Sequence, residues 1–169
     1  VKATVGHRAV VVIGSRRFKL SDNVSNTDPA YIKRGRISVA VHDFKPEVVE
    51  CTPLDGSSEA YRTARLVNVF TRKSFEILDK HPVNIERTRK GLLKANIVLL
   101  RDSGGRLPTV KPIREVYGMP LAAVTEMPVE KGIARLLKMR VMEVPPPTSD
   151  KRSDYQIRLE AALKALRED

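Results

Sequence analysis

Four short apolar runs, separated by segments with helical spacing, constrain the fold of this chain more than any other feature. The runs cover residues 8–14, 95–101, 121–125 and 140–144, and each has the length of a β-strand. Continuous apolar character of this kind is typical of strands that are covered on both faces. The alternation of strands and helices predicts an α/β (α+β) fold, in which helices pack on the faces of a mixed β-sheet.

Helices are predicted wherever apolar residues recur at steps of three and four. The clearest case is residues 57–80, where one face is shared by Ala60, Ala64, Val67, Phe70 or Thr71, Phe75 and Leu78. Further helices are expected from His81-Pro82 to about Leu93, over 113–117, from Pro128, and after a Ser153-x-x-Gln156 capping box with the stripe Leu159, Ala162, Leu163 and Leu166. We expect one domain over residues 1–169, because this length suits a single core.

Charge is the unusual feature of the composition. The chain has 31 Lys and Arg against 20 Asp and Glu, which gives a net charge of +11 and a pI near 10.0. Such a balance favours an anionic partner, whether nucleic acid, acidic membrane or phosphorylated metabolite, although it is also typical of a solvated basic face. Cys51 is the single cysteine, so a disulfide within the chain and a cysteine-based zinc site are excluded.

Motifs for common catalytic chemistry are missing from the sequence. The three histidines form no zinc-binding helix pair, and neither Gly-x-Ser-x-Gly nor a P-loop is present. With 5% aromatic residues and no tryptophan, a stacking platform for nucleic acid is poorly supplied. No apolar run reaches the roughly 18–20 residues of a membrane helix, and the start does not resemble a secretory signal. We expect a cytoplasmic protein without a membrane partner, and the composition disfavours nucleic-acid binding.

Two loops hold the best candidates for a binding site. Gly6-His7-Arg8 precedes the first apolar run, and the turn-rich segment 20–29 follows it with Asp22 and Asp28. Imidazole and guanidinium groups together can hold a small phosphate or carboxylate, and a carboxylate nearby can orient those cations or accept hydroxyl groups. The alternative is an ordinary region of Asx turns and caps.

Five motifs in register resemble those of the archaeal-type cofactor-independent phosphoglycerate mutases, members of the alkaline phosphatase superfamily. They are Gly6-His7-Arg8-Ala9-Val10-Val11, Leu20-Ser21-Asp22-Asn23-Val24-Ser25-Asn26-Thr27-Asp28-Pro29, His81-Pro82-Val83-Asn84 with Arg87 and Gly91, Ala95-Asn96, and Lys131-Gly132-Ile133-Ala134. Chains of that family are much longer. This sequence is similar to the family's inserted, substrate-binding domain taken alone.

The resemblance implies a function and a division of labour. Family members interconvert 2- and 3-phosphoglycerate through a phosphoserine enzyme and a pair of divalent metal ions of the manganese, magnesium, cobalt or zinc type. It implies that the chain holds no catalytic residue, metal site or other cofactor of its own, that its partner is the missing metal-binding phosphatase domain, and that it is inactive alone. The substrate-binding residues implied for the ligand phosphoglycerate are His7, Arg8, Asp22, Asp28, Arg87 and Arg101.

Departures from the family pattern leave alternatives open. Asn26 and Ala30 stand where the family's turn motif has Asp and His, and Pro146-Pro147 replaces a glycine-containing stretch. A related phosphotransferase or phosphatase with another phosphorylated substrate therefore stays open. So does a basic nucleic-acid module built on Arg16, Arg17, Lys19, Lys33, Arg34 and Arg36. A free-standing interaction domain with an exposed apolar patch is the third alternative.

Overall fold

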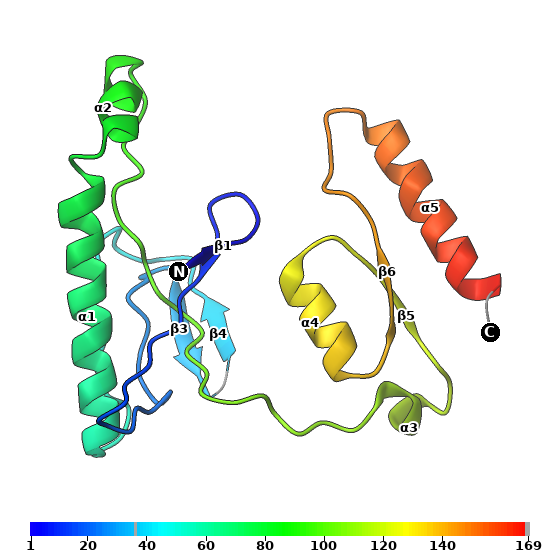
Figure 1. Cartoon of the computed structure of the whole chain (residues 1–169), viewed down its shortest axis with the longest axis horizontal. Coiled ribbons are helices and arrows are strands. Elements are labelled where there is room, and N and C mark those ends of the chain that lie inside the picture. The colour runs from blue at the N-terminus through cyan, green and yellow to red at the C-terminus, as the bar shows by residue number, and fades with distance from the viewer. Residues whose placement is uncertain (36, 168–169) are drawn as a thin grey trace. The chain divides into compact units, whose positions relative to one another are not determined.

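The chain is a mixed α/β protein, as predicted. The computed structural model describes residues 1–35 and 37–167, which form five helices and three two-stranded sheets (Figure 1). Two of these sheets are antiparallel and the third is parallel. The expected mixed sheet is therefore divided, in the described residues, into three separate strand pairs.

The chain forms two compact units, whereas one domain over residues 1–169 is expected from the sequence. Unit 1 comprises residues 1–13 and 108–169, and unit 2 comprises residues 14–107. Unit 2 is thus nested within the sequence of unit 1. The boundaries coincide with Gly14 and Pro108, residue types that interrupt regular structure.

Helix α1 (Ser58–Leu78) forms the long element of unit 2. Its start is fixed by Ser57, whose side chain accepts a hydrogen bond from the Ala60 amide at 3.1 Å. The predicted helical face is confirmed in its first half, where Ala60, Ala64 and Val67 are buried. Farther along, Thr71 is also buried as predicted, but the predicted face is wrong at Phe75, which is 45% exposed.

Unit 2 also contains one short helix and one hairpin. Helix α2 (Pro82–Arg89) ends four residues earlier than expected, before Gly91 in the left-handed region. Strands β3 (Tyr31–Arg34) and β4 (Ile37–Ala40) pair antiparallel, with Tyr31 opposite Ala40. β4 confirms the first half of the strand expected over residues 37–44.

The strand expected over residues 95–101 is absent from the structure. Two of its amides bond to side chains: the amide of Val98 donates to Ser74 Oγ at 2.9 Å, and that of Leu100 donates to Thr27 Oγ1 at 2.7 Å. A single backbone bond, from the Thr27 amide to Leu100 O at 2.8 Å, joins the same two residues. These bonds satisfy part of the polar backbone without a β-ladder. The apolar run therefore follows α1 as an extended segment (Figure 1).

Unit 1 is built around a β-α-β arrangement. Strand β5 (Ala122–Thr125), helix α4 (Pro128–Leu136) and strand β6 (Arg140–Glu143) follow one another, and the strands pair in parallel. The short helix α3 (Ile113–Tyr117) precedes them and ends at Gly118, which has a φ of 74°. These elements match the expectations from sequence.

Helix α5 (Lys151–Arg167) contacts both β5 and β6. It begins two residues before the expected capping box, and Asp150 caps it by accepting from the Ser153 amide at 3.2 Å. The predicted apolar stripe does not form the buried face, since Leu159 and Leu166 are 58% and 77% exposed. Asp154 is buried instead, and its carboxylate bonds to the backbone and hydroxyl of Thr148 at 2.8 and 3.0 Å.

The buried strand expected over residues 8–14 is also wrong in most of its length. Strand β2 (Ala9–Val10) pairs with β1 (Lys2–Ala3) for two residues only. Beyond this pair the β-branched run continues without a strand assignment, and Val12 is 86% exposed.

Candidate functional site

His7 and Arg8 lie in the tight turn that joins β1 to β2 in unit 1. Gly6 has a φ of 58°, a conformation that glycine adopts without strain, and the Arg8 amide donates to Val5 O at 3.1 Å. Both predicted site residues are exposed. The guanidinium of Arg8 lies 3.8 Å from Met127 Sδ, next to the start of α4, and has no acidic partner within residues 1–35 and 37–167.

Asp22 anchors the glycine turn of unit 2. Its Oδ2 accepts a hydrogen bond from the Gly105 amide at 2.8 Å, and its backbone carbonyl accepts from Ser103 Oγ at 2.7 Å. Lys33 on β3 reaches the same two residues, donating to Asp22 O and to Ser103 Oγ, both at 2.5 Å. One carboxylate oxygen of Asp22 is therefore engaged within the protein.

The fold of unit 2 places Asp28 and Arg101, two of the expected substrate-binding residues, next to each other. The Asp28 carboxylate lies 4.0 Å from the Arg101 guanidinium, and Asp102 lies 3.4 Å from it. Both distances exceed the roughly 2.7–2.9 Å of a strong charge-assisted hydrogen bond. Arg101 also stacks over the Tyr31 ring at 3.6 Å, which fixes its position. Its guanidinium keeps donor capacity for an anion.

Thr27 connects the two loops that carry this pair. It is completely buried, its amide donates to Leu100 O at 2.8 Å, and its hydroxyl accepts from the Leu100 amide. Thr27 immediately precedes Asp28, and Leu100 immediately precedes Arg101. We call these hydrogen bonds between Thr27 and Leu100 the tether. The tether sets the distance between the side chains of Asp28 and Arg101.

Two further residues belong to this site: Tyr31, which site assignment from sequence missed, and Lys33, which was considered only for the nucleic-acid alternative. They lie two residues apart on β3, so their side chains are on the same side of the strand. Partial burial lowers the pKa of the Lys33 ammonium below its usual value, although the negative charges near it, Asp22 first, act in the opposite direction. The sequence signal that could have indicated them is that Tyr31 and Lys33 lie two residues apart, shortly after the turn of residues 20–29.

We call Asp22, Asp28, Tyr31, Lys33, Arg101, Asp102 and Ser103 the polar cluster of unit 2. The cluster carries three carboxylates and two cations, so it is not a simple basic pocket. It can orient a ligand that has both an anionic group for Arg101 and hydroxyl groups for carboxylate oxygens.

Arg87 lies outside the polar cluster, in the last turn of α2. Its Nε donates to Leu93 O at 2.8 Å and so ties the end of α2 to the following loop. The structure thus gives this predicted site residue a local structural contact. Of the basic residues considered for nucleic acid, Arg16 and Arg17 are exposed in a loop, and Arg36 is outside the described residues.

Metal ligands are not gathered in the part of the chain that the structure describes. Residues 1–35 and 37–167 contain no group of three or more His, Cys, Asp or Glu side chains placed to hold an ion. Cys51 is buried, and burial raises the pKa of its thiol. None of the described helices has the length and hydropathy needed to cross a membrane.

Comparison with known proteins decides the family. A family model described as 2,3-bisphosphoglycerate-independent phosphoglycerate mutase matches residues 1–84. Over 98% of its length the chain is 44% identical to the protein of that name from Aeropyrum pernix. It is 36% identical, again over 98%, to 2,3-bisphosphoglycerate-independent phosphoglycerate mutase 1 from Archaeoglobus fulgidus. This chain belongs to the 2,3-bisphosphoglycerate-independent phosphoglycerate mutase family.

The match covers only part of each mutase. The chain spans 39% of the Aeropyrum protein and 37% of the Archaeoglobus protein. Its fold is similar to that of the PH0037 protein from Pyrococcus horikoshii, with a TM-score of 0.50, 20% identity, and coverage of 90% of this chain and 46% of that one. The chain therefore corresponds to a region of a phosphoglycerate mutase.

Proposed function

We propose that this chain is the substrate-binding part of a cytoplasmic phosphoglycerate mutase that interconverts 2- and 3-phosphoglycerate in glycolysis and gluconeogenesis. The observation that carries the proposal is 44% identity, over 98% of the chain, to a mutase from Aeropyrum pernix. The proposed ligand carries a phosphate, a carboxylate and a hydroxyl group. It therefore matches the mixture of cations and carboxylates in the candidate residues.

Each unit carries its own group of residues that is proposed to bind phosphoglycerate. In unit 1, His7 and Arg8 offer donors to an anionic group, and Arg8 is free of an acidic partner in the described residues. In unit 2, Arg101 offers its guanidinium, while Asp28 and the free oxygen of Asp22 accept from hydroxyl groups. Arg87 is a weaker candidate because its Nε is already bonded to Leu93 O.

Phosphoryl transfer is assigned to polypeptide that this chain does not span. The family resemblance implies a divalent metal pair, but the described residues contain no group of ligands that fits one. We therefore derive no step through a metal on this chain. Its proposed contribution is to hold and orient the glycerate during transfer, which is chiefly positioning.

A titration followed by NMR tests the binding role. Isotope-labelled chain is titrated with 3-phosphoglycerate and, separately, with a random oligonucleotide of equal charge. We expect saturable shifts at His7, Arg8 and Arg101 with phosphoglycerate. Shifts with the oligonucleotide alone, weakening steeply with salt, would support the nucleic-acid alternative instead.

Matched variants make the titration specific. Arg8→Met and Arg101→Met each remove a charge that is proposed to bind the ligand. Each should weaken phosphoglycerate affinity by about 10- to 150-fold, since a charge-assisted bond contributes roughly 1.5–3 kcal/mol. Arg16→Met removes an equal charge from the exposed loop and should leave the affinity within about twofold. Equal losses in all three variants would show that binding depends on net charge alone.

A further inference from the structure

A cavity of about 460 Å³ lies at the start of α1 in unit 2, and we call it the Asp22 cavity. Its polar lining comprises two cations, two carboxylates and two hydroxyl groups: Lys19, Arg106, Asp22, Glu59, Ser21 and Ser57. Its volume is within the range of small-molecule sites. Because Asp22 is also a member of the polar cluster, the cavity adjoins residues that are proposed to bind phosphoglycerate.

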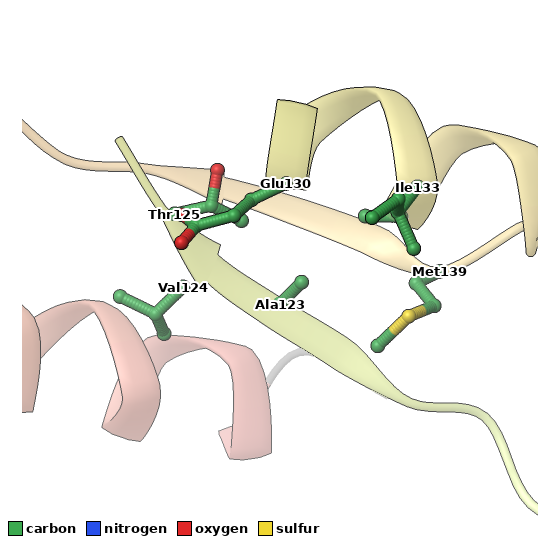
Figure 2. A pocket seen from close by; sticks show the side chains of 7 residues that line it. Ala123, Val124, Thr125, Glu130, Ile133 and Met139 are labelled. Carbon is green, nitrogen blue, oxygen red and sulfur yellow. The ribbon is translucent and has the colours of Figure 1, made fainter. Parts of the chain in front are cut away.

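A cavity of about 280 Å³ in unit 1 has a different character. Residues of β5 and α4 line it together with Met139, and Figure 2 shows that most of the labelled side chains are apolar. An anion there would meet the carboxylate of Glu130 and, among the described residues that line the cavity, no cation. Recognition of an anionic ligand therefore favours the Asp22 cavity.

Both cations of the Asp22 cavity keep their donors for a ligand. Lys19 and Arg106 are exposed, and neither forms an ion pair or a side-chain hydrogen bond within residues 1–35 and 37–167. Hydrogen bonds from its own amide and from Ser58 lower the pKa of the Glu59 carboxyl, and the charges of Arg62 and Lys19 act in the same direction. Lys19 thus lies near Glu59 without being ion-paired to it.

Hydrogen bonds hold two walls of the Asp22 cavity together. The Ser21 amide donates to Thr63 Oγ1 at 3.1 Å, and the Thr63 hydroxyl donates to Glu59 O at 2.9 Å. The segment that carries Lys19 is therefore fixed against the first turns of α1. Walls that are fixed before binding lower the entropic cost of ordering a ligand.

Asp22 fixes the third wall. Its Oδ2 accepts from the Gly105 amide at 2.8 Å, and its carbonyl accepts from Ser103 Oγ at 2.7 Å. Gly105 immediately precedes Arg106, and Arg101 lies two residues before Ser103. One loop, anchored twice on Asp22, therefore carries a guanidinium group at each end.

The polar cluster alone has too few available cations for phosphoglycerate, which carries both a phosphate and a carboxylate. Of its two cations, Lys33 already donates to Asp22 O and to both oxygens of Ser103. Arg101 is then the cation of the cluster that keeps donors for a ligand. Lys19 and Arg106 supply the further positive charge within unit 2.

We propose that the Asp22 cavity binds the glycerate end of phosphoglycerate, with Lys19 and Arg106 on its carboxylate and with Glu59 and Asp22 accepting from its hydroxyl group. This inference rests on the proposed function. It adds Lys19, Glu59 and Arg106 to the residues that recognise the substrate.

The chemistry of the reaction favours this end of the molecule. The carboxylate is common to 2- and 3-phosphoglycerate, so cations that hold it keep the molecule in place while the phosphoryl group moves. The carboxylates of Glu59 and Asp22 repel a doubly charged phosphate but accept hydrogen bonds from a hydroxyl group. The phosphate then stays outside the cavity, where the polypeptide that transfers it can reach it.

NMR titration of the isotope-labelled chain with D-glycerate and, separately, with inorganic phosphate tests the assignment. D-Glycerate has the carboxylate of phosphoglycerate and hydroxyl groups but no phosphate. We expect saturable shifts of the Glu59 and Arg106 amides with D-glycerate. Absence of these shifts would overturn the proposal.

Charge-removing variants make this test specific. Lys19→Met and Arg106→Met should each weaken D-glycerate binding at least about tenfold, and each should change the affinity for inorganic phosphate less than about twofold. Arg16→Met removes an equal charge from the exposed loop and should leave D-glycerate affinity within about twofold. Equal losses for D-glycerate and phosphate, or equal losses in all three variants, would overturn the proposal.

Propionate, which has a carboxylate but no hydroxyl group, isolates the role of Glu59. Glu59→Met should weaken D-glycerate binding about threefold or more and leave propionate binding unchanged, because the lost acceptor serves the hydroxyl group. Equal effects on the two ligands would contradict the assignment of Glu59.

The two proposals fail in distinguishable ways. Phosphoglycerate shifts at His7, Arg8 and Arg101 with affinity unchanged in Lys19→Met and Arg106→Met would reject the role of the cavity alone. Saturable binding of D-glycerate in the cavity, with no binding of phosphoglycerate, would reject the proposed function.

Discussion

Replacing Thr27 by valine should separate the two loops that hold Asp28 and Arg101. The Thr27 hydroxyl accepts from the Leu100 amide at 2.7 Å, and the side chain is completely buried. Valine has nearly the same shape but leaves that amide without a partner, which should cost about 1–3 kcal/mol of unfolding free energy. Thr27→Ser keeps the hydroxyl and loses one methyl group, at about 1 kcal/mol.

Two measurements separate the hydroxyl from the packing. Guanidinium unfolding followed by circular dichroism gives the free energies of both variants, and hydrogen exchange reports on the Leu100 amide directly. Thr27→Val should raise exchange at Leu100 about tenfold beyond the change in global stability, and Thr27→Ser should not. Thr27→Val should also weaken phosphoglycerate binding more than Thr27→Ser does. Equal exchange at Leu100 in the two variants would refute the tether.

Two further predictions concern buried polar side chains. Asn84→Ala removes hydrogen bonds to Leu78 O at 2.7 Å and to the Ala95 backbone at 2.7 and 3.1 Å. The free energy of unfolding, measured with guanidinium, should therefore fall by about 2–4 kcal/mol. A fall below about 1 kcal/mol would contradict this role of Asn84. Hydrogen bonds from Thr148, the backbone one first, lower the pKa of the Asp154 carboxyl below its ordinary 3.8 in the folded state. The resulting stabilisation is present above that ordinary value and is lost as pH falls through the folded value. Thermal unfolding against pH should therefore show a steeper acid loss for the unmodified chain than for Asp154→Asn, whereas parallel curves would contradict the assignment.

Local sequence signals predicted the helices well. The spacing of Ala60, Ala64 and Val67 identified α1, Gly118 marked the end of α3, and Pro128 marked the start of α4. These features act within a few residues of one another along the chain. Hence they can be found without knowledge of the tertiary structure.

Strands were predicted less well because their partners lie far away in sequence. The run over residues 95–101 has the apolar composition of a buried strand, but Thr27 and Ser74 take its backbone bonds. The run after Ala9 has the same composition and pairs for two residues only. Composition reports the tendency to be extended, whereas pairing depends on which edges are available.

The candidate site was predicted in part. Asp28 and Arg101 are 73 residues apart in sequence, and the structure places their charged groups 4.0 Å apart. Tyr31 was missed, and Lys33 was considered only for the nucleic-acid alternative, because neither belongs to a motif of the phosphoglycerate site. Their contribution depends on the turn of residues 20–29 folding back against β3, which requires the long-range bonds of Lys33 to Asp22 and Ser103.

The most direct test of the whole account is an enolase-coupled assay for the conversion of 3- to 2-phosphoglycerate, run with added manganese on two proteins. One is the 169-residue chain, and the other is its chimera with the remainder of the Aeropyrum pernix mutase. We predict turnover by the chimera, its loss in the Arg8→Met chimera, and none above background by the chain alone. Turnover by the chain alone, or a folded chimera that binds manganese but has no activity, would contradict the assignment of substrate binding to this polypeptide and of phosphoryl transfer to the rest.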